Sequence, residues 1–438
     1  MTSESSGQQP SPARAFAVAR HGKLWLVPTI LSALVALCLS LLYLGGILNP
    51  NSNLHHLPIA LVNADQGPPL PGQQQTLGAQ VSQSVISATP AGTVQWRRLS
   101  QAQMQDQLAS GKVYGALVVP ADFTTSVAAL TSTEATARPA LTVLTNPGLG
   151  SLGSSLAGQI TQRAAHQASL AIGRQLVSQA SAHGANATTR ALLDDPITVT
   201  TRVGHAIGRH SGLGLTAFYF TLLLVLTGFV GGNIINSGVD AGLGYTDNEI
   251  GPWHTRRPTV PISRTQTLLL KMLLTAGITA LTTSLLMIAA IAILGMDASH
   301  LPLLWIFSYC ASLAVGLGVQ AINAAFGGIG QLVSMFVFIA LALPSSGATI
   351  PLHAVPDFYR FLALFEPMRQ LSDGVRAILY FDAQADAGLT RGWIMIAVGV
   401  ALALLFGFAM SLYYDRKGLH RLTARSAVPA TPHPPERS

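Results

Sequence analysis

Long uncharged apolar segments recur along the chain and are separated by polar ones. Because an α-helix rises about 1.5 Å per residue, about 20 apolar residues are needed to cross the hydrocarbon core of a bilayer. We therefore expect a polytopic α-helical membrane protein with six transmembrane helices. These are predicted at residues 24–48, 211–236, 266–294, 301–323, 325–343 and 392–414.

The fourth and fifth of these helices come from a single apolar stretch. Residues 301–351 contain no Asp, Glu, Lys or Arg. A single helix over residues 301–343 would be about 64 Å long, which is twice the hydrocarbon thickness. Gly327 and Gly328 form the only Gly-Gly pair of the stretch, and such pairs are typical of turns. We therefore predict two spans that meet there.

The first apolar segment has two interpretations, a signal peptide or a retained helix. It follows Arg20 and Lys23, as the apolar part of a signal peptide would. Its apolar core is, however, longer than the roughly 7–15 residues of signal peptides, and no small-residue cleavage site follows it. We therefore predict a retained membrane-spanning helix.

Residues 49–210, between the first two spans, alternate between strand-like and helix-like patterns, which favours an α/β domain. Strands are expected at Leu57–Asn63, Thr93–Leu99, Val113–Pro120 and Ala140–Pro147. Helices are expected at Gln75–Ala88, Gln101–Ser110 and Asp122–Leu130, the last with Asp122 as its cap. A long, weakly apolar helix from Gly150 to Ser181 is expected to pack on another helix or on a second subunit.

The segment 344–391, between the last two spans, predicts two amphipathic helices. Phe358, Phe361 and Phe365 fall on one helical face, Pro367 ends that helix, and a second apolar face follows. Helices of this kind lie in the membrane interface or dip into the bilayer.

Composition and charge agree with a membrane protein. The chain has 49% hydrophobic and 10% charged residues, whereas soluble domains carry roughly 25% charged residues. The net charge is +7, and Lys and Arg occur in each of the segments 1–23, 237–265 and 415–438. Since cytoplasmic loops are rich in these residues, all three segments are predicted to be cytoplasmic, and residues 49–210 and 344–391 extracytoplasmic. The membrane is then the plasma or inner membrane. This placement accounts for the positive charge without nucleic-acid binding. The Pro-rich end of the tail 415–438 predicts disorder.

The sequence contains no motif for catalysis or cofactor binding. Gly precedes Lys23 and Lys112, but Leu24 and Val113 follow them where a phosphate-binding loop has Ser or Thr. No His-Glu-x-x-His motif occurs, and Cys38 and Cys310 lie apart in apolar segments. We therefore expect no enzyme activity, no cofactor and no metal site.

Polar residues inside the predicted spans are sparse. Such residues are costly in lipid and face other helices or a cavity. Hydrogen bonds between helices are one interpretation, and a translocation path is the other. A path would contain Gln320, Asn323, Gln331, Glu366, Arg369 and Arg376, although the last three can instead pair with one another. Lys271, near one end of its span, is expected to extend toward the membrane surface. No carboxylate lies in the middle of a predicted span, which argues against a proton-coupled pump.

Three segments resemble a known family. Leu57–Gly67 (LPIALVNADQG) resembles the opening of the outer domain of ABC-2 type permeases of the YhgE/Pip-like branch, and Gly111–Phe123 (GKVYGALVVPADF) resembles a second motif of that domain. Leu343–Leu379 resembles the segment after the fifth span of that family. One span, a large outer domain and five clustered spans are also its layout.

The resemblance implies a permease subunit that works with a separate cytoplasmic ATPase, as a homodimer or as a heterodimer with a similar permease. It also implies that the loop between the second and third spans couples to that ATPase. Asp247, Glu249, Arg256 and Arg257 are then the coupling residues, and Val260–Ser263 (VPIS) resembles the family segment before the third span.

Two hypotheses follow. The first is the permease of an ABC-2-like bacterial exporter for a hydrophobic or amphipathic substrate, such as a drug, a lipid or an envelope precursor. The second is a membrane-anchored scaffold or receptor, of the phage-adsorption or secretion-accessory type, without transport activity.

Overall fold

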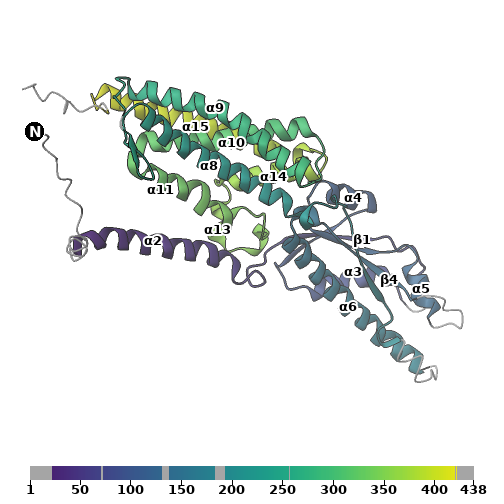
Figure 1. The fold of residues 1–438 in the computed structure, drawn as a ribbon. Coiled ribbons are helices and arrows are strands. Elements are labelled where there is room, and N and C mark those ends of the chain that lie inside the picture. Colours follow the sequence, from purple (N-terminus) through teal and green to yellow (C-terminus); the bar gives the residue numbers. More distant parts are fainter. Residues whose placement is uncertain are drawn as a thin grey trace, which may run out of the picture.

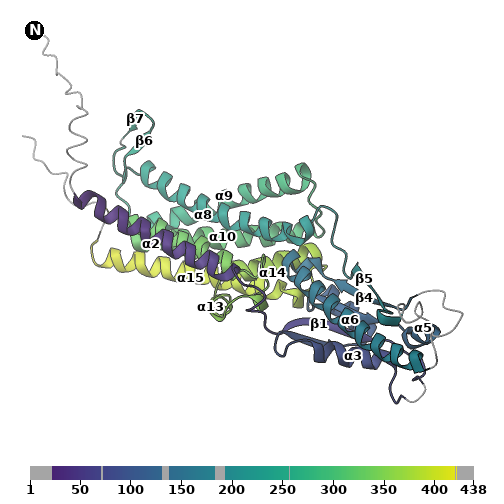
Figure 2. The ribbon, with the colours of Figure 1, turned by 90° about the horizontal axis from the view of Figure 1, so that it is seen from below.

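The computed structural model describes residues 22–70, 73–130, 138–182, 193–255, 257–419 and 421. Most of the predicted N-terminal tail and of the C-terminal tail, together with Arg256, lie outside these residues. Figures 1 and 2 show a bundle of long helices with a small β-sheet at one end and a short hairpin at the other. We call these the sheet end and the hairpin end.

Five helices in the described part are long and apolar enough to cross a membrane, when Leu301–Ser345 is counted as one. The protein is therefore a helical membrane protein. These spans contain α2 (Gly22–Ile47), α8 (Thr216–Gly242), α9 (Arg264–Met287), α10 (Leu301–Phe326) and α15 (Leu389–Arg416). A π-helical turn at Ile288–Ile293 follows α9.

The apolar stretch after α10 is interrupted at the predicted glycine pair. Gly327 has a φ of +59°, which favours glycine, and a short 3₁₀ turn Gly327–Ile329 follows. The chain then forms α11 (Gly330–Met335), a π-helical turn (Phe336–Ala340) and α12 (Ala342–Ser345). Phe338 packs against Gly318, so this second arm runs back along α10.

The core of the bundle is formed by α8, α9, α10 and α15, joined at the sheet end by α14 (Pro367–Tyr380). Phe307 of α10 packs against Gly374 of α14 and Gly392 of α15. The apolar face of α14 is therefore covered by the bundle, whereas in α13 (Asp357–Leu362) Phe358 and Phe361 are exposed. Of the two predicted amphipathic helices, the second is a packed part of the core.

Helix α2 lies beside the bundle with little burial of its own (Figure 2). Its described contacts are at its sheet end, where the Tyr359 hydroxyl donates to the carbonyl oxygen of Leu41 at 2.9 Å. The Tyr43 hydroxyl in turn donates to the carbonyl oxygen of Ile339 at 3.3 Å. Most of the apolar surface of α2 is therefore free for lipid or for another chain.

The sheet has five strands in the order β2-β1-β3-β4-β5. The first three, β1 (Leu57–Asn63), β2 (Val94–Arg98) and β3 (Gly115–Val119), are parallel. Strand β4 (Ala140–Thr145) is antiparallel to β3, and β5 (Thr198–Val203) is parallel to β4. The polar pattern of β5, an edge strand, did not predict a strand.

Helices α3 (Leu77–Ala88) and α6 (Ser151–Ala182) cover one face of the sheet, and α4 (Gln101–Ala109) covers the other. The long helix predicted at residues 150–181 therefore packs on α3 and the sheet of its own chain. The short α5 (Phe123–Ala129) has Asp122 at its N-cap, but the side chain caps no backbone amide and instead accepts from the Ser126 hydroxyl. This part of the prediction was wrong.

The end of α14 joins the sheet to the bundle. Phe381 packs against Gly111 and Gly148, where a Cβ atom would lie 2.9 Å from its ring. The Tyr380 hydroxyl donates to the carbonyl oxygen of Ser211 at 3.3 Å and accepts from the Ala217 amide at 3.2 Å. These contacts fix the start of α8 to α14 and to the sheet.

Candidate functional site at the hairpin end

The loop between α8 and α9 carries a two-stranded hairpin, β6 (Asn248–Ile250) and β7 (Trp253–Thr255). Of the predicted coupling residues, Glu249 pairs in register with His254, and Asp247 lies 3.8 Å from His254. Arg257 follows the hairpin, and Arg256 lies outside the described residues. The Tyr245 hydroxyl donates to the carbonyl oxygen of Val260 at 2.9 Å and closes the base of the loop.

Helix α8 continues six residues beyond the predicted end of its span, so Asp240 belongs to the helix and not to the loop. Its carboxylate lies 2.7 Å from the ammonium group of Lys271, which also donates to Asn236 at 2.6 Å. The side chains of Lys271 and Asp240 are only 3% and 12% exposed. The prediction that Lys271 extends to the surface was therefore wrong: its charge is buried and paired.

Arg421 forms a second ion pair with the same carboxylate and lies over the ring of Tyr245. Removing charges from water costs several kcal/mol per ion unless partners compensate. Asp240 supplies this compensation for two cations, and it joins α8, α9 and the segment after α15.

The start of α9 is fixed by a capping box. The Ser263 hydroxyl accepts from the Gln266 amide, and the Gln266 side chain accepts from the Ser263 amide. The carboxylate of Asp415 accepts from the backbone amides of Arg264 and Thr265, each at 3.0 Å. The segment VPIS therefore ends in a helix cap, and the end of α15 lies against the start of α9.

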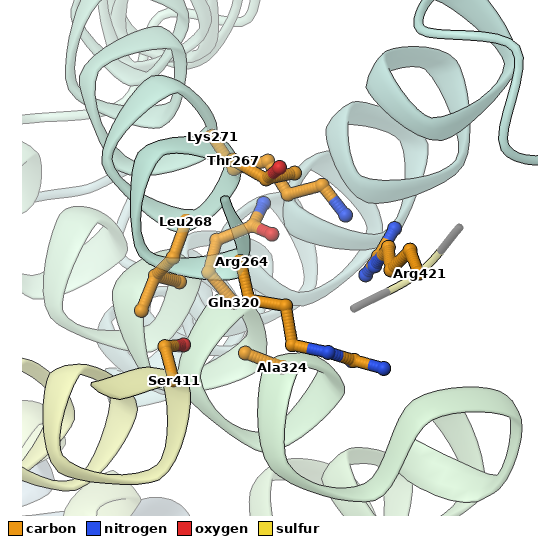
Figure 3. Close-up of a pocket in the computed structure, with 8 residues that line it drawn as sticks. All are labelled: Arg264, Thr267, Leu268, Lys271, Gln320, Ala324, Ser411 and Arg421. Carbon is orange, nitrogen blue, oxygen red and sulfur yellow. The ribbon is translucent and has the colours of Figure 1, made fainter. Parts of the chain in front are cut away.

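A small polar pocket lies just inside this ion-pair cluster (Figure 3). Its volume is about 10 Å³, which is room for about one water molecule. Arg264, Lys271 and Arg421 line it. The side-chain oxygens of Gln320 and Ser411 also reach it, and both are buried without a hydrogen-bond partner in the described structure.

Two of the polar residues predicted for a path inside the bundle, Gln320 and Asn323, form contacts between helices. The Gln320 amide donates to the carbonyl oxygen of Gly232 at 2.9 Å and to the Thr275 hydroxyl at 3.2 Å. Asn323 donates to the side-chain oxygen of Asn233 at 3.1 Å. Gln331 and Asn233 line a groove of about 380 Å³ between α8 and α11. We call the line of contacts from Asp240 to Gln320 and Asn323 the polar seam.

The other three predicted path residues lie at the sheet end, in a separate cluster (Figure 1). Glu366 caps α14 by accepting from the Arg369 amide at 3.1 Å, and burial raises the pKa of its carboxyl to about 8. Arg369 and Arg376 both face Asp373, at 4.0 Å and 3.6 Å. The prediction that Glu366, Arg369 and Arg376 pair with one another was wrong. The two arginines share the carboxylate of Asp373, and Glu366 accepts from a backbone amide.

Sequence reasoning missed Asp240, Asp373, Asp415 and Arg421. One signal was present: Asn236 and Asp240 are four residues apart, which places them on one face of a helix. Asp240 lies near the end of α8, beyond the predicted span 211–236, so the expectation that no carboxylate lies in the middle of a span is not contradicted by it. Helix α8 is long and apolar enough to cross a membrane.

The long apolar helices define a helical membrane protein, and the polar seam lies within its bundle. Comparison with known proteins gives its family. A model described as "Protein of unknown function (DUF3533)" matches residues 28–399, so the chain belongs to that family.

A curated relative, "Uncharacterized protein YhgE" of Bacillus subtilis (strain 168), is 26% identical over 131 residues. The match covers 30% of this chain and 16% of that protein. It supports a YhgE-like family and carries no information on activity. No solved structure matches the chain.

Proposed function

We propose that the chain is the permease subunit of an ABC-2-like exporter that moves a hydrophobic or amphipathic substrate, driven by a separate cytoplasmic ATPase. In this proposal it acts as a dimer with itself or with a similar permease. The hairpin end faces the cytoplasm of a bacterial cell, and the sheet is extracytoplasmic. The resemblance in three segments and the arrangement of the helices support it.

One observation carries the proposal. The hairpin loop is continuous with α8 and α9, and Asp240, Lys271 and Asp415 tie those helices to each other and to α15. A partner that displaces the loop therefore moves helices that line the polar seam, rather than a detached connector. Exposed Trp253 at the tip of the hairpin supplies an apolar contact for such a partner.

Six spans fit this arrangement better than five. The end of α15 contacts the start of α9, so an even number of crossings lies between these points. Helices α9, α10 and α15 supply three crossings, and the arm formed by α11 and α12 supplies the fourth. In this proposal, both described ends, Gly22 and Arg421, lie on the side of the hairpin.

The test is a pull-down of the tagged chain in mild detergent, with an ATPase assay and mass spectrometry of the eluate. We expect a stoichiometric ATPase that is lost in the double variant Asp247→Lys, Glu249→Lys. The control is Asp106→Lys, which makes the same kind of charge reversal at one exposed residue of α4. An ATPase that is retained equally in both variants would refute the coupling role of the loop.

A scaffold or receptor is the second candidate function. It is favoured by the tight packing of the bundle, because the pocket inside the ion-pair cluster has room for about one water molecule. This candidate predicts a chain that purifies without an ATPase and with partners bound to the sheet. The same pull-down therefore separates the two functions.

A further inference from the structure

The three parallel strands β2, β1 and β3 have the strand order of a doubly wound fold, with β1 in the middle. In such sheets, ligands bind outside the carboxyl ends of the strands, at the point where the strand order reverses. The order β2-β1-β3 places that point between β1 and β3. The carboxyl end of β1 is Asn63, and the loop after it reaches Asp65 and Gly67.

The side chain of Asp65 occupies the position between the ends of β1 and β3, where such folds bind a ligand. Its carboxylate accepts from the amides of Gly67, Gly78 and Thr124 and from the Thr124 hydroxyl. Burial alone would raise the pKa of Asp65, but these hydrogen bonds together outweigh burial and lower it. The donors that an external anion would use at the start of α3 are therefore occupied.

The neighbouring position, between β1, β2 and α3, is open. A pocket of about 800 Å³ lies there, within the range of about 300–1,000 Å³ that small-molecule sites occupy. Side chains with hydrogen-bonding groups line it from all three elements: Asn63, Gln75, Ser82, Gln83 and Arg98. The sheet places these groups at the same carboxyl edge at which related folds bind ligands.

The charge and chemistry of the lining define the ligand. Among the described residues that line the pocket, Arg98 is the one charged group, and its guanidinium donates to Gln83 at 3.4 Å. Amides both donate and accept hydrogen bonds, which suits hydroxyl groups, and a guanidinium binds carboxylate or phosphate. The ligand is then a small molecule with several hydroxyl groups and one anionic group.

We propose that this pocket binds a hydroxyl-rich molecule with one anionic group, such as a sugar acid or a sugar phosphate, with Arg98 on that group. The same chemistry occurs in a free sugar derivative and in the headgroup of an anionic lipid. The site does not depend on the proposed export function, because it belongs to a sheet that a scaffold or receptor would equally carry.

The chain supplies a matched control at the adjacent residue. Arg97 points to the other face of the sheet, where it donates to the Gln107 side chain at 3.1 Å and to the carbonyl oxygen of Lys112 at 3.3 Å. Arg97→Gln and Arg98→Gln therefore remove the same charge from opposite faces of one strand. Arg98→Lys keeps the charge in the pocket and tests for rescue.

The experiment is calorimetric titration of the full chain in nanodiscs with glucuronic acid, glucose 6-phosphate and neutral glucose. We expect at least one charged sugar to bind saturably and at least about tenfold more tightly than glucose. Arg98→Gln should abolish that difference, Arg98→Lys should restore part of it, and Arg97→Gln should leave it unchanged. Saturable binding of none of the three sugars, or equal loss in both Gln variants, would overturn the proposal.

The lipid composition of the nanodiscs separates the two sources of the ligand. The titrations are repeated with phosphatidylcholine alone and with added phosphatidylglycerol. Weaker binding of the soluble sugars in the presence of phosphatidylglycerol identifies a lipid headgroup as the occupant. Unchanged binding identifies a free sugar derivative.

Discussion

Asp240 forms ion pairs with two cations, Lys271 and Arg421. Substitution of Asp240 should therefore lower the stability of the fold more than substitution of one of the cations. Asp240→Asn leaves both cations facing each other, one of them 3% exposed, and we expect a loss of about 3 kcal/mol or more. Lys271→Met leaves Asp240 paired with Arg421, so the loss should be smaller. Thermal unfolding of the detergent-solubilised chain measures both.

Asp247→Asn is the control for this prediction, since the ion pair of Asp247 with His254 is about half exposed. Such surface pairs contribute about 0–1 kcal/mol, so the melting temperature should change little. An Asp240→Asn chain as stable as the Lys271→Met chain would contradict the shared-carboxylate arrangement.

Glu366 gives stability a defined dependence on pH. Its pKa is raised to about 8 by burial, against an ordinary value of 4.5, so the folded chain holds a proton that the unfolded chain releases between these values. Stability is therefore lost as the pH rises from about 4.5 to about 8, by up to about 1.4 kcal/mol per pH unit. Glu366→Gln has no proton to lose, so its melting temperature should rise relative to the wild type across this window.

The comparison needs an exposed carboxylate as its control. Glu249 is exposed on the hairpin, and Glu249→Gln makes the same substitution away from the buried Glu366. A constant difference between the wild type and Glu366→Gln would show that the Glu366 carboxyl is ionised in the folded chain.

At the scale of elements, glycines set how closely the helices approach. A Cβ atom at Gly228 of α8 would lie 2.5 Å from the carbonyl oxygen of Ser312 on α10 and 2.9 Å from Cβ of Val315. Gly228→Ala should therefore force the two helices apart and cost about 1–3 kcal/mol. Thermal unfolding is again the measurement.

The same helix supplies the control. At Gly231 a Cβ atom would have no neighbour within 4 Å in the described structure, so Gly231→Ala should be neutral or slightly stabilising. Equal destabilisation by both substitutions would mean that the effect comes from the helix itself and not from the α8–α10 contact.

Elements with a strong local period could be predicted from the sequence, and their partners could not. The long apolar helices and the strands β1 to β4 each have a pattern of their own. Strand β5 was missed because an exposed edge strand reads as Thr-Val-Thr-Thr-Arg-Val, with no apolar face. The ion pair of Asp240 with Arg421 joins residues 181 positions apart, and no local pattern encodes such a contact.

The same difference explains the candidate site. Gln320 and Asn323 were selected because an amide in a membrane helix is costly, which a sequence shows directly. Their acceptors, Gly232 and Asn233, depend on how α8 packs on α10. Glu366, Arg369 and Arg376 were grouped with them by polarity alone, and the fold places them at the opposite end.

At the scale of the whole molecule, the number of crossings determines which face of the membrane each segment occupies. The chain offers a direct test, because its two cysteines, Cys38 and Cys310, can be replaced and single cysteines introduced elsewhere. Exposed positions suit this purpose: Ser87 on α3, Thr255 on the hairpin and Lys417 after α15.

We expect a membrane-impermeant maleimide to label Ser87→Cys on intact cells, and Thr255→Cys and Lys417→Cys only after permeabilisation. Ser87 belongs to α3 and Thr255 to β7, which lie at opposite ends of the molecule with α8 between them in the chain (Figure 2). One crossing by α8 accounts for the first difference. The labelling of Lys417→Cys distinguishes six spans from five. If Leu301–Ser345 crossed once, the segment after α15 would lie on the side of the sheet, and Lys417→Cys would react like Ser87→Cys. The hydrogen bonds from the amides of Arg264 and Thr265 to Asp415 would then join opposite faces of the membrane, which a bilayer about 30 Å thick forbids.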